Sequence, residues 1–110
     1  MAAPPPSFEV RLAALRADWQ ARLPDRLHEL RAALDACRAA PADAGAIEDL
    51  HRRVHTLAGA AGTFGLPQLS TQAKALEHGL EALMERPART AADFDTAQAA
   101  LDALPASGEA

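Results

Sequence analysis

A histidine followed by glycines at helical spacing is the part of this sequence that could do chemistry. His55 lies in an apolar run with helical periodicity, and glycines follow it at positions 59, 62 and 65. A glycine inside a helix costs about 1 kcal/mol relative to alanine, and the chain uses alanine freely elsewhere. The glycines therefore indicate a helix surface that is kept clear of side chains beside an imidazole.

The neighbours of this histidine on a helix can be placed from the sequence. The outer face of the segment would carry His51, Arg52, His55, Gly59 and Gly62. Helical side chains lean toward the N-terminus of their helix, so the ring of His55 should cover the turn that holds His51 and Arg52. Gly59 would leave the opposite flank of the ring open to a visiting molecule.

An accessible imidazole of this kind can act as a nucleophile toward a phosphoryl donor. Neutral imidazole is the nucleophilic form, and much of it is neutral near pH 7. Phosphoryl transfer depends mainly on positioning and charge stabilisation. A partner's metal-bearing active site could therefore supply the remaining chemistry.

The residues around His55 resemble the signature of the histidine-containing phosphotransfer (HPt) domains of bacterial two-component phosphorelays. That signature is His-x-Leu-Lys-Gly, then five variable residues and a glycine. This chain has HTLAG from His55 to Gly59, followed by Gly65 at the matching distance. The resemblance is strongest over residues 45–85. It implies that His55 is the phosphorylated residue and that Gly59 makes room for an incoming receiver domain.

The same resemblance implies a function for the chain. His55 would accept a phosphoryl group and relay it to or from an aspartate of a response-regulator receiver domain, with that receiver and/or a hybrid sensor histidine kinase as partner. HPt domains lack a nucleotide-binding domain, and nothing in this sequence resembles one. We therefore expect no kinase or nucleotide-binding activity and no cofactor, and leave open whether such a phosphocarrier counts as an enzyme. The alternative is an HPt-like binding module that holds a receiver or kinase without carrying phosphate.

Ala58 departs from the family pattern, in which lysine is usual at this position. That lysine, one turn from the histidine, is thought to hold or neutralise the phosphoryl group. Two other cations could replace its charge: Arg52 in the preceding turn, and Lys74, which lies near the level of His55 when residues are counted outward from Gly65. The missing lysine is the one feature that favours the binding-module alternative.

Two of these residues have a further interpretation. His51 and His55 are spaced as two metal ligands on one helix face, and Glu77 and His78 could add ligands from the next helix. No carboxylate lies within the His51–His55 turn as in zinc hydrolases, and metal sites in bundles usually use several inward glutamates. We therefore expect no metal site. Gly62 could instead permit close packing against a neighbouring helix.

Five helical segments are expected to position these residues. Apolar residues make up 49% of the chain but aromatic residues only 4%, which favours helix packing over a sheet. The segments run over about residues 8–22, 24–39, 43 or 46 to 65, 67 to just before 87, and 91–103. Short connections predict an all-α fold, an antiparallel up-down four-helix bundle with an additional short N-terminal helix.

The organisation of the chain follows from this pattern. We expect a disordered lead at 1–6, an HPt-like helical bundle at 7–104 and a disordered tail at 105–110. Trp19 and Phe8 are expected to close one end of the bundle, with the alternative that Phe8 is exposed and helps to dock a partner.

Composition and charge exclude several other classes of protein. Fifteen acidic and 11 basic residues give a net charge of −4, without the basic stripe of a nucleic-acid binder. The single Cys37 cannot form an internal disulfide and is expected in the core. No apolar run approaches the ~20 residues that span a bilayer, and the start lacks the features of a signal peptide. We expect a cytoplasmic monomer that binds neither nucleic acid nor membrane.

Overall fold

The computed structural model describes residue 5 and residues 7–106, and it is helical throughout its regular structure. Its elements are α1 (Phe8–Ala21), α2 (Leu23–Ala39), α3 (Ala44–Thr63), α4 (Pro67–Met84), the 3₁₀ helix η1 (Ala91–Phe94) and α5 (Asp95–Asp102). The described residues contain no strand, and no helix formed by them combines the length and apolarity needed to cross a membrane. The disordered ends expected at 1–6 and 105–110 lie largely outside the described residues.

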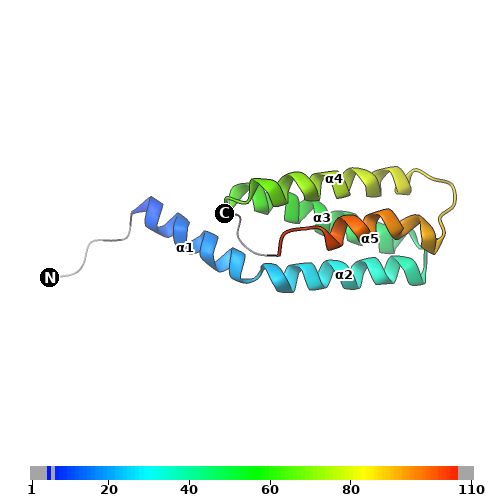
Figure 1. Cartoon of the computed structure of the whole chain (residues 1–110), viewed down its shortest axis with the longest axis horizontal. Helices are drawn as coiled ribbons and strands as arrows, with labels where there is room; N and C mark the ends of the chain where they lie inside the picture. The colour runs from blue at the N-terminus through cyan, green and yellow to red at the C-terminus, as the bar shows by residue number, and fades with distance from the viewer. Residues whose placement is uncertain (1–4, 6, 107–110) are drawn as a thin grey trace.

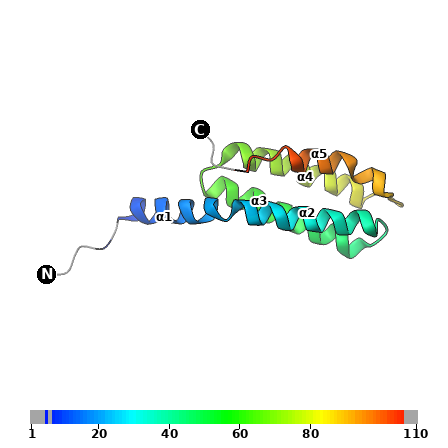
Figure 2. The same ribbon diagram turned by 60° about the horizontal axis from the view of Figure 1, so that its bottom comes forward.

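Four helices, α2 to α5, run alternately up and down beside one another, and α1 projects beyond them (Figure 1). A second view shows the same arrangement, with α1 continuing the line of α2 away from the bundle (Figure 2). The predicted antiparallel four-helix bundle with an additional N-terminal helix is therefore confirmed. That additional helix has 14 residues and is longer than α5, which has 8.

The apolar stripes of the helices meet in one core. Its largest fully buried side chains are Leu23, Leu27, Leu34, Cys37, Ile47, Leu50, Val54, Leu66, Leu69, Leu80, Phe94 and Leu101. Full burial of a leucine side chain contributes about 1.5–3 kcal/mol. Packing of these stripes, more than the helix propensity of each segment, therefore holds the helices in register. The core position expected for Cys37 is confirmed.

The turn between α3 and α4 determines where α4 begins. Gly65 has a φ of +81°, in the left-handed region that glycine adopts without a steric penalty. The amide of Leu66 donates to the carbonyl of Ala61 at 2.8 Å, which is the long-range bond of a Schellman stop. Pro67 then opens α4, at a position where its missing N–H is not needed. The predicted helix stop at Gly65 is confirmed.

The N-terminal helix is buried mainly at Trp19, near its C-terminal end. Ser7 caps it as expected, since the amide of Val10 donates to the Ser7 hydroxyl at 3.1 Å. Trp19 is buried and stacks on Phe64, with ring centroids 5.6 Å apart. Phe8, however, is 70% exposed. The prediction that it closes the bundle is wrong, because α1 extends past the ends of the other helices (Figure 1).

Candidate functional site

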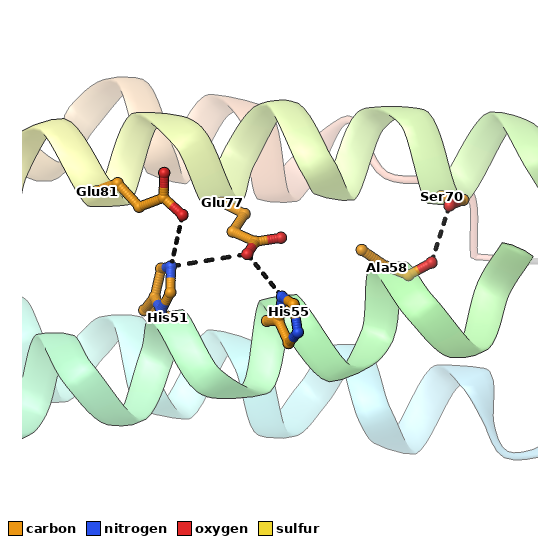
Figure 3. Close-up of polar contacts among 6 residues, drawn as sticks. All are labelled: His51, His55, Ala58, Ser70, Glu77 and Glu81. Atoms are coloured by element: carbon orange, nitrogen blue, oxygen red, sulfur yellow. Dashed lines mark hydrogen bonds and ion pairs between the residues drawn. The ribbon is translucent and has the colours of Figure 1, made fainter.

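The site is built on one face of the α3–α4 pair, which a buried hydrogen bond holds together (Figure 3). The hydroxyl of Ser70 on α4 donates to the carbonyl of Ala58 on α3 at 2.8 Å, and Ser70 is buried. A Cβ added at Gly62 would come 3.3 Å from the Ser70 oxygen. Gly62 therefore lies against α4 and permits the close approach of the two helices, which is the alternative that the sequence left open.

His55 projects from α3 with its side chain 71% exposed. Its Nδ1 lies 2.7 Å from Oε2 of Glu77 on α4 (Figure 3). An ionised carboxylate can only accept a hydrogen bond, so we assign the proton of the neutral ring to Nδ1. The lone pair is then on Nε2, the ring nitrogen that Glu77 does not contact. Nε2 is therefore the ring nitrogen that is left free for other contacts.

Glu77 itself is held firmly. Its side chain is only 12% exposed, although it carries a carboxylate. Besides His55, it lies 3.7 Å from Nε2 of His51, and His51 in turn contacts the carboxylate of Glu81 at 3.1 Å. The result is a row of two histidines on α3 facing two glutamates on α4. His51 thus reaches the site through Glu77, and the two histidines face different glutamates at their shortest polar contacts.

The flank of His55 toward the C-terminus of α3 is open. A Cβ added at Gly59 would meet no atom within 4 Å, and Gly59 is exposed. Ala58, one residue before it, is by contrast 2% exposed and faces α4. The position where the resemblance places a lysine is therefore part of the helix interface in this chain.

The two cations proposed from the sequence differ in their surroundings. Arg52 is exposed and bonds the carboxylate of Asp49 at 2.9 Å. Hydrogen bonds from Arg53 and Arg52 to Asp49 keep the pKa of that carboxyl below its ordinary value, so Arg52 is already engaged in an ion pair. Lys74 is exposed, and it makes no hydrogen bond or ion pair with any residue that the structure describes. It lies three residues before Glu77, on the same helix.

A groove of about 330 Å³ opens on the other side of α3, between that helix and the α1–α2 junction. Its wall includes Arg52 and Thr56, which flank His55 along α3, and Trp19 at the junction. The guanidinium of Arg26 lies over the Trp19 ring at 5.5 Å. The exposed surface beside His55 therefore continues into a groove with both apolar and charged walls.

The family of the chain follows from its similarity to known protein families. The family model described as Hpt domain matches residues 14–107, which is most of the chain. The chain belongs to the Hpt family. No curated protein and no solved structure gave a significant match.

Membership of this family makes the protein a phosphotransfer domain of two-component systems, and such domains interact with receiver domains or kinases. The Hpt domain of this chain also has contacts that the histidine motif alone does not reveal. The bonds from Glu77 to His55 and from Ser70 to Ala58 both join α3 to α4. The sequence indicates these pairs only through their distance from the turn. In each pair, the two residues lie a similar number of positions before and after Gly65.

Proposed function

We propose that this Hpt domain accepts a phosphoryl group on Nε2 of His55 and relays it to or from the aspartate of a response-regulator receiver domain. The main support is the geometry of the ring, which is 71% exposed and whose Nδ1 lies within hydrogen-bond distance of the largely buried carboxylate of Glu77. This combination leaves one nitrogen available to solvent and gives the other a fixed acceptor. A receiver domain, a hybrid sensor kinase, or both would supply the phosphate.

The transfer step uses few groups of this chain. The lone pair of Nε2 forms a bond to phosphorus while the bond from phosphorus to the aspartate oxygen breaks, and the electron pair leaves with the carboxylate. The proton of the ring stays on Nδ1 throughout. Glu77 stabilises the positive charge that develops on the ring, because its carboxylate lies 2.7 Å from that N–H. The reverse sequence returns the phosphoryl group to an aspartate.

The open surface beside Gly59 is the proposed docking face. A receiver must bring its aspartyl phosphate to Nε2 with the reacting atoms roughly in line, and no side chain stands within 4 Å of the space beside Gly59. The groove that begins at Thr56 extends this face toward Trp19. Its mixture of apolar and charged walls suits a non-obligate interface. We further propose that the domain acts as a monomer, since the bundle buries its own core, and that it works in the cytoplasm.

Lys74 is the better candidate for the charge that the family's lysine usually supplies. It is free of partners among the described residues, whereas Arg52 would first have to leave Asp49. We therefore expect Lys74→Ala to slow phosphate uptake from a phosphorylated receiver more than Arg52→Ala does. Unchanged rates in both variants would remove the idea that either cation replaces the lysine.

The deciding experiment incubates the protein with a receiver domain phosphorylated on aspartate. The wild type should acquire a label that acid removes and base does not, as expected for a phosphoramidate, and His55→Gln should acquire none. His78→Gln is the matched control, because His78 is exposed on α4. If the wild type binds the receiver but takes no label, the chain is the binding module that Ala58 favours, and the proposed relay fails.

A further inference from the structure

His51, Glu77 and Glu81 bring three potential metal ligands to one point between α3 and α4 (Figure 3). Nε2 of His51 lies 3.1 Å from Oε1 of Glu81 and 3.7 Å from Oε2 of Glu77. The three ligand atoms all lie within 4.8 Å of one another. The sequence pairs His51 with His55 as possible ligands, whereas the fold groups His51 with two carboxylates of the facing helix.

The separations between these atoms suit a small divalent cation. Zinc binds histidine nitrogen and carboxylate oxygen at about 2.0–2.2 Å, usually in a tetrahedron. Ligand atoms at the corners of such a tetrahedron are about 3.3–3.6 Å apart. The two distances from His51, 3.1 Å and 3.7 Å, lie on either side of that range. The carboxylate atoms of Glu77 and Glu81 lie within 4.8 Å of each other, so side-chain rotation would have to bring these two oxygens together around an ion.

The elements that carry these ligands are already fixed. Glu77 and Glu81 are one turn apart on α4, so their carboxylates lie on the same helix face. The buried bond from Ser70 to Ala58 and the close contact at Gly62 hold α4 against α3. The side chains of Glu77 and His51 are 12% and 24% exposed, and that of Glu81 is 50% exposed. A cation would therefore meet a largely preformed and partly desolvated site.

The net charge of the three side chains also favours a cation. Two carboxylates face one imidazole, so this group of three carries a net negative charge whichever form the imidazole takes. By the argument used for His55, Nε2 of His51 carries the proton that is donated to Glu81 at 3.1 Å. A metal ion takes the place of this proton, and Nε2 presents its lone pair when the ring proton is on Nδ1. A nitrogen and two oxygens suit zinc and similar transition metals better than magnesium, which prefers oxygen ligands and keeps its water.

We propose that His51, Glu77 and Glu81 form a binding site for a divalent transition-metal ion of the zinc type. Three protein ligands leave a fourth position for water or for a group of a partner. The site shares Glu77 with His55, whose Nδ1 lies 2.7 Å from the same oxygen. A metal ion would draw electron density from that carboxylate and weaken its hydrogen bond to the phosphorylation histidine. This last consequence, a metal-dependent slowing of phosphate uptake, rests on the proposed function of His55.

Zinc binding to the purified full chain tests the site without reference to phosphotransfer. Titration calorimetry with Zn²⁺ should give one ion per chain for the wild type. Glu81→Gln and His51→Gln should bind at least about ten-fold more weakly, because each loses a direct ligand. His78→Gln and Glu85→Gln are matched controls on or beside α4 and should bind like the wild type. Circular dichroism should show the same helix content in all variants.

The His55→Gln variant distinguishes this ligand set from the pair suggested by the sequence. It should bind Zn²⁺ as the wild type does, since His55 is not among the three ligands. Loss of binding in His55→Gln, or equal binding by Glu81→Gln and the wild type, would overturn the proposed site. Absence of stoichiometric binding by the wild type would also overturn it.

The coupling to phosphotransfer is tested separately. Zn²⁺ should slow phosphate uptake from a phosphorylated receiver in the wild type and have a smaller effect in Glu81→Gln. Equal slowing of both would show that the ion acts on the receiver and would overturn the coupling. If His55 takes no phosphate at all, the calorimetry still tests the metal site, so failure of the site and failure of the relay remain distinguishable.

Discussion

A hydrogen bond of 2.7 Å joins Glu77 on α4 to His55 on α3. The Glu77 carboxylate is largely buried, whereas the His55 ring is exposed. The bond constrains the orientation of the ring without covering Nε2. Because Glu77 can only accept, it also selects which nitrogen carries the proton. A residue of α4 therefore fixes the orientation of the histidine on α3 for which phosphorylation is proposed.

Loss of this carboxylate should therefore impair transfer without unfolding the bundle. We expect Glu77→Ala to slow phosphate uptake by about ten- to hundred-fold, by analogy with the loss of a carboxylate that orients a metal-binding histidine. Glu77→Gln should have a smaller effect, because its amide oxygen can still accept from Nδ1. The measurement is the rate of labelling by a phosphorylated receiver, with Glu85→Ala as control. Nitrogen chemical shifts of the His55 ring should show a mixture of tautomers in Glu77→Ala, and a single unchanged tautomer would contradict the assigned role.

Gly59 offers a test of the docking face, and Gly79 is its control. Both glycines lie inside helices, and an added Cβ would meet nothing within 4 Å at either position. Alanine at each should stabilise the protein by up to about 1 kcal/mol, because glycine is a poor helix former. Gly59→Leu should nevertheless slow uptake strongly, whereas Gly79→Leu should not. Equal transfer rates in the two leucine variants would show that the surface beside Gly59 is not used for docking.

Ser70 should contribute to stability more than a surface serine. Its hydroxyl donates to the Ala58 carbonyl from a buried position, and a typical bond of this kind contributes about 1 kcal/mol. We expect Ser70→Ala to lower the free energy of unfolding by about that amount in urea denaturation. Thr71→Ala, at an exposed neighbouring position, is the control, and equal midpoints for the two variants would contradict the assignment.

Cys37 should make stability fall at alkaline pH. Burial raises the pKa of its thiol from 9.0 to about 11, so the unfolded chain releases this proton at a lower pH than the folded chain does. The stabilising contribution is fully present below about pH 9 and is lost as pH rises toward 11. The loss of unfolding free energy reaches about 1 kcal/mol by pH 10. Urea denaturation between pH 8 and pH 10 checks this. Cys37→Ala should lack that part of the slope, and identical slopes would count against the shift.

The arrangement within single helices could be predicted from the sequence. The bundle follows from the apolar spacing and the short connections, and the stop follows from Gly65, because glycine suits the left-handed position just past a helix end. The exposed position of His55 and the open space beside Gly59 depend only on the helical repeat of α3 and its buried stripe. These features were predictable because residues three and four apart share a helix face.

Contacts between helices were harder to predict from the sequence. The pairing of Glu77 with His55 depends on the register and rotation of α4 relative to α3, which periodicity does not supply. Gly62 could be placed on a face but not against Ser70, because that choice depends on how closely the two helices approach. The exposure of Phe8 depends on the length of the neighbouring helices, and an apolar stripe on α1 gives no information about where they end.

The short turn at Gly65 sets the rotation of α4 about its own axis, and with it the position of Glu77 beside His55. Because an α-helix advances about 100° per residue, one residue added between this turn and Ser70 would rotate the remainder of α4 by more than a quarter of a circle. Glu77 would then point away from His55 although every residue of the histidine motif was intact. Insertions and deletions in this loop are therefore expected to be far more damaging than in the longer connection that precedes η1.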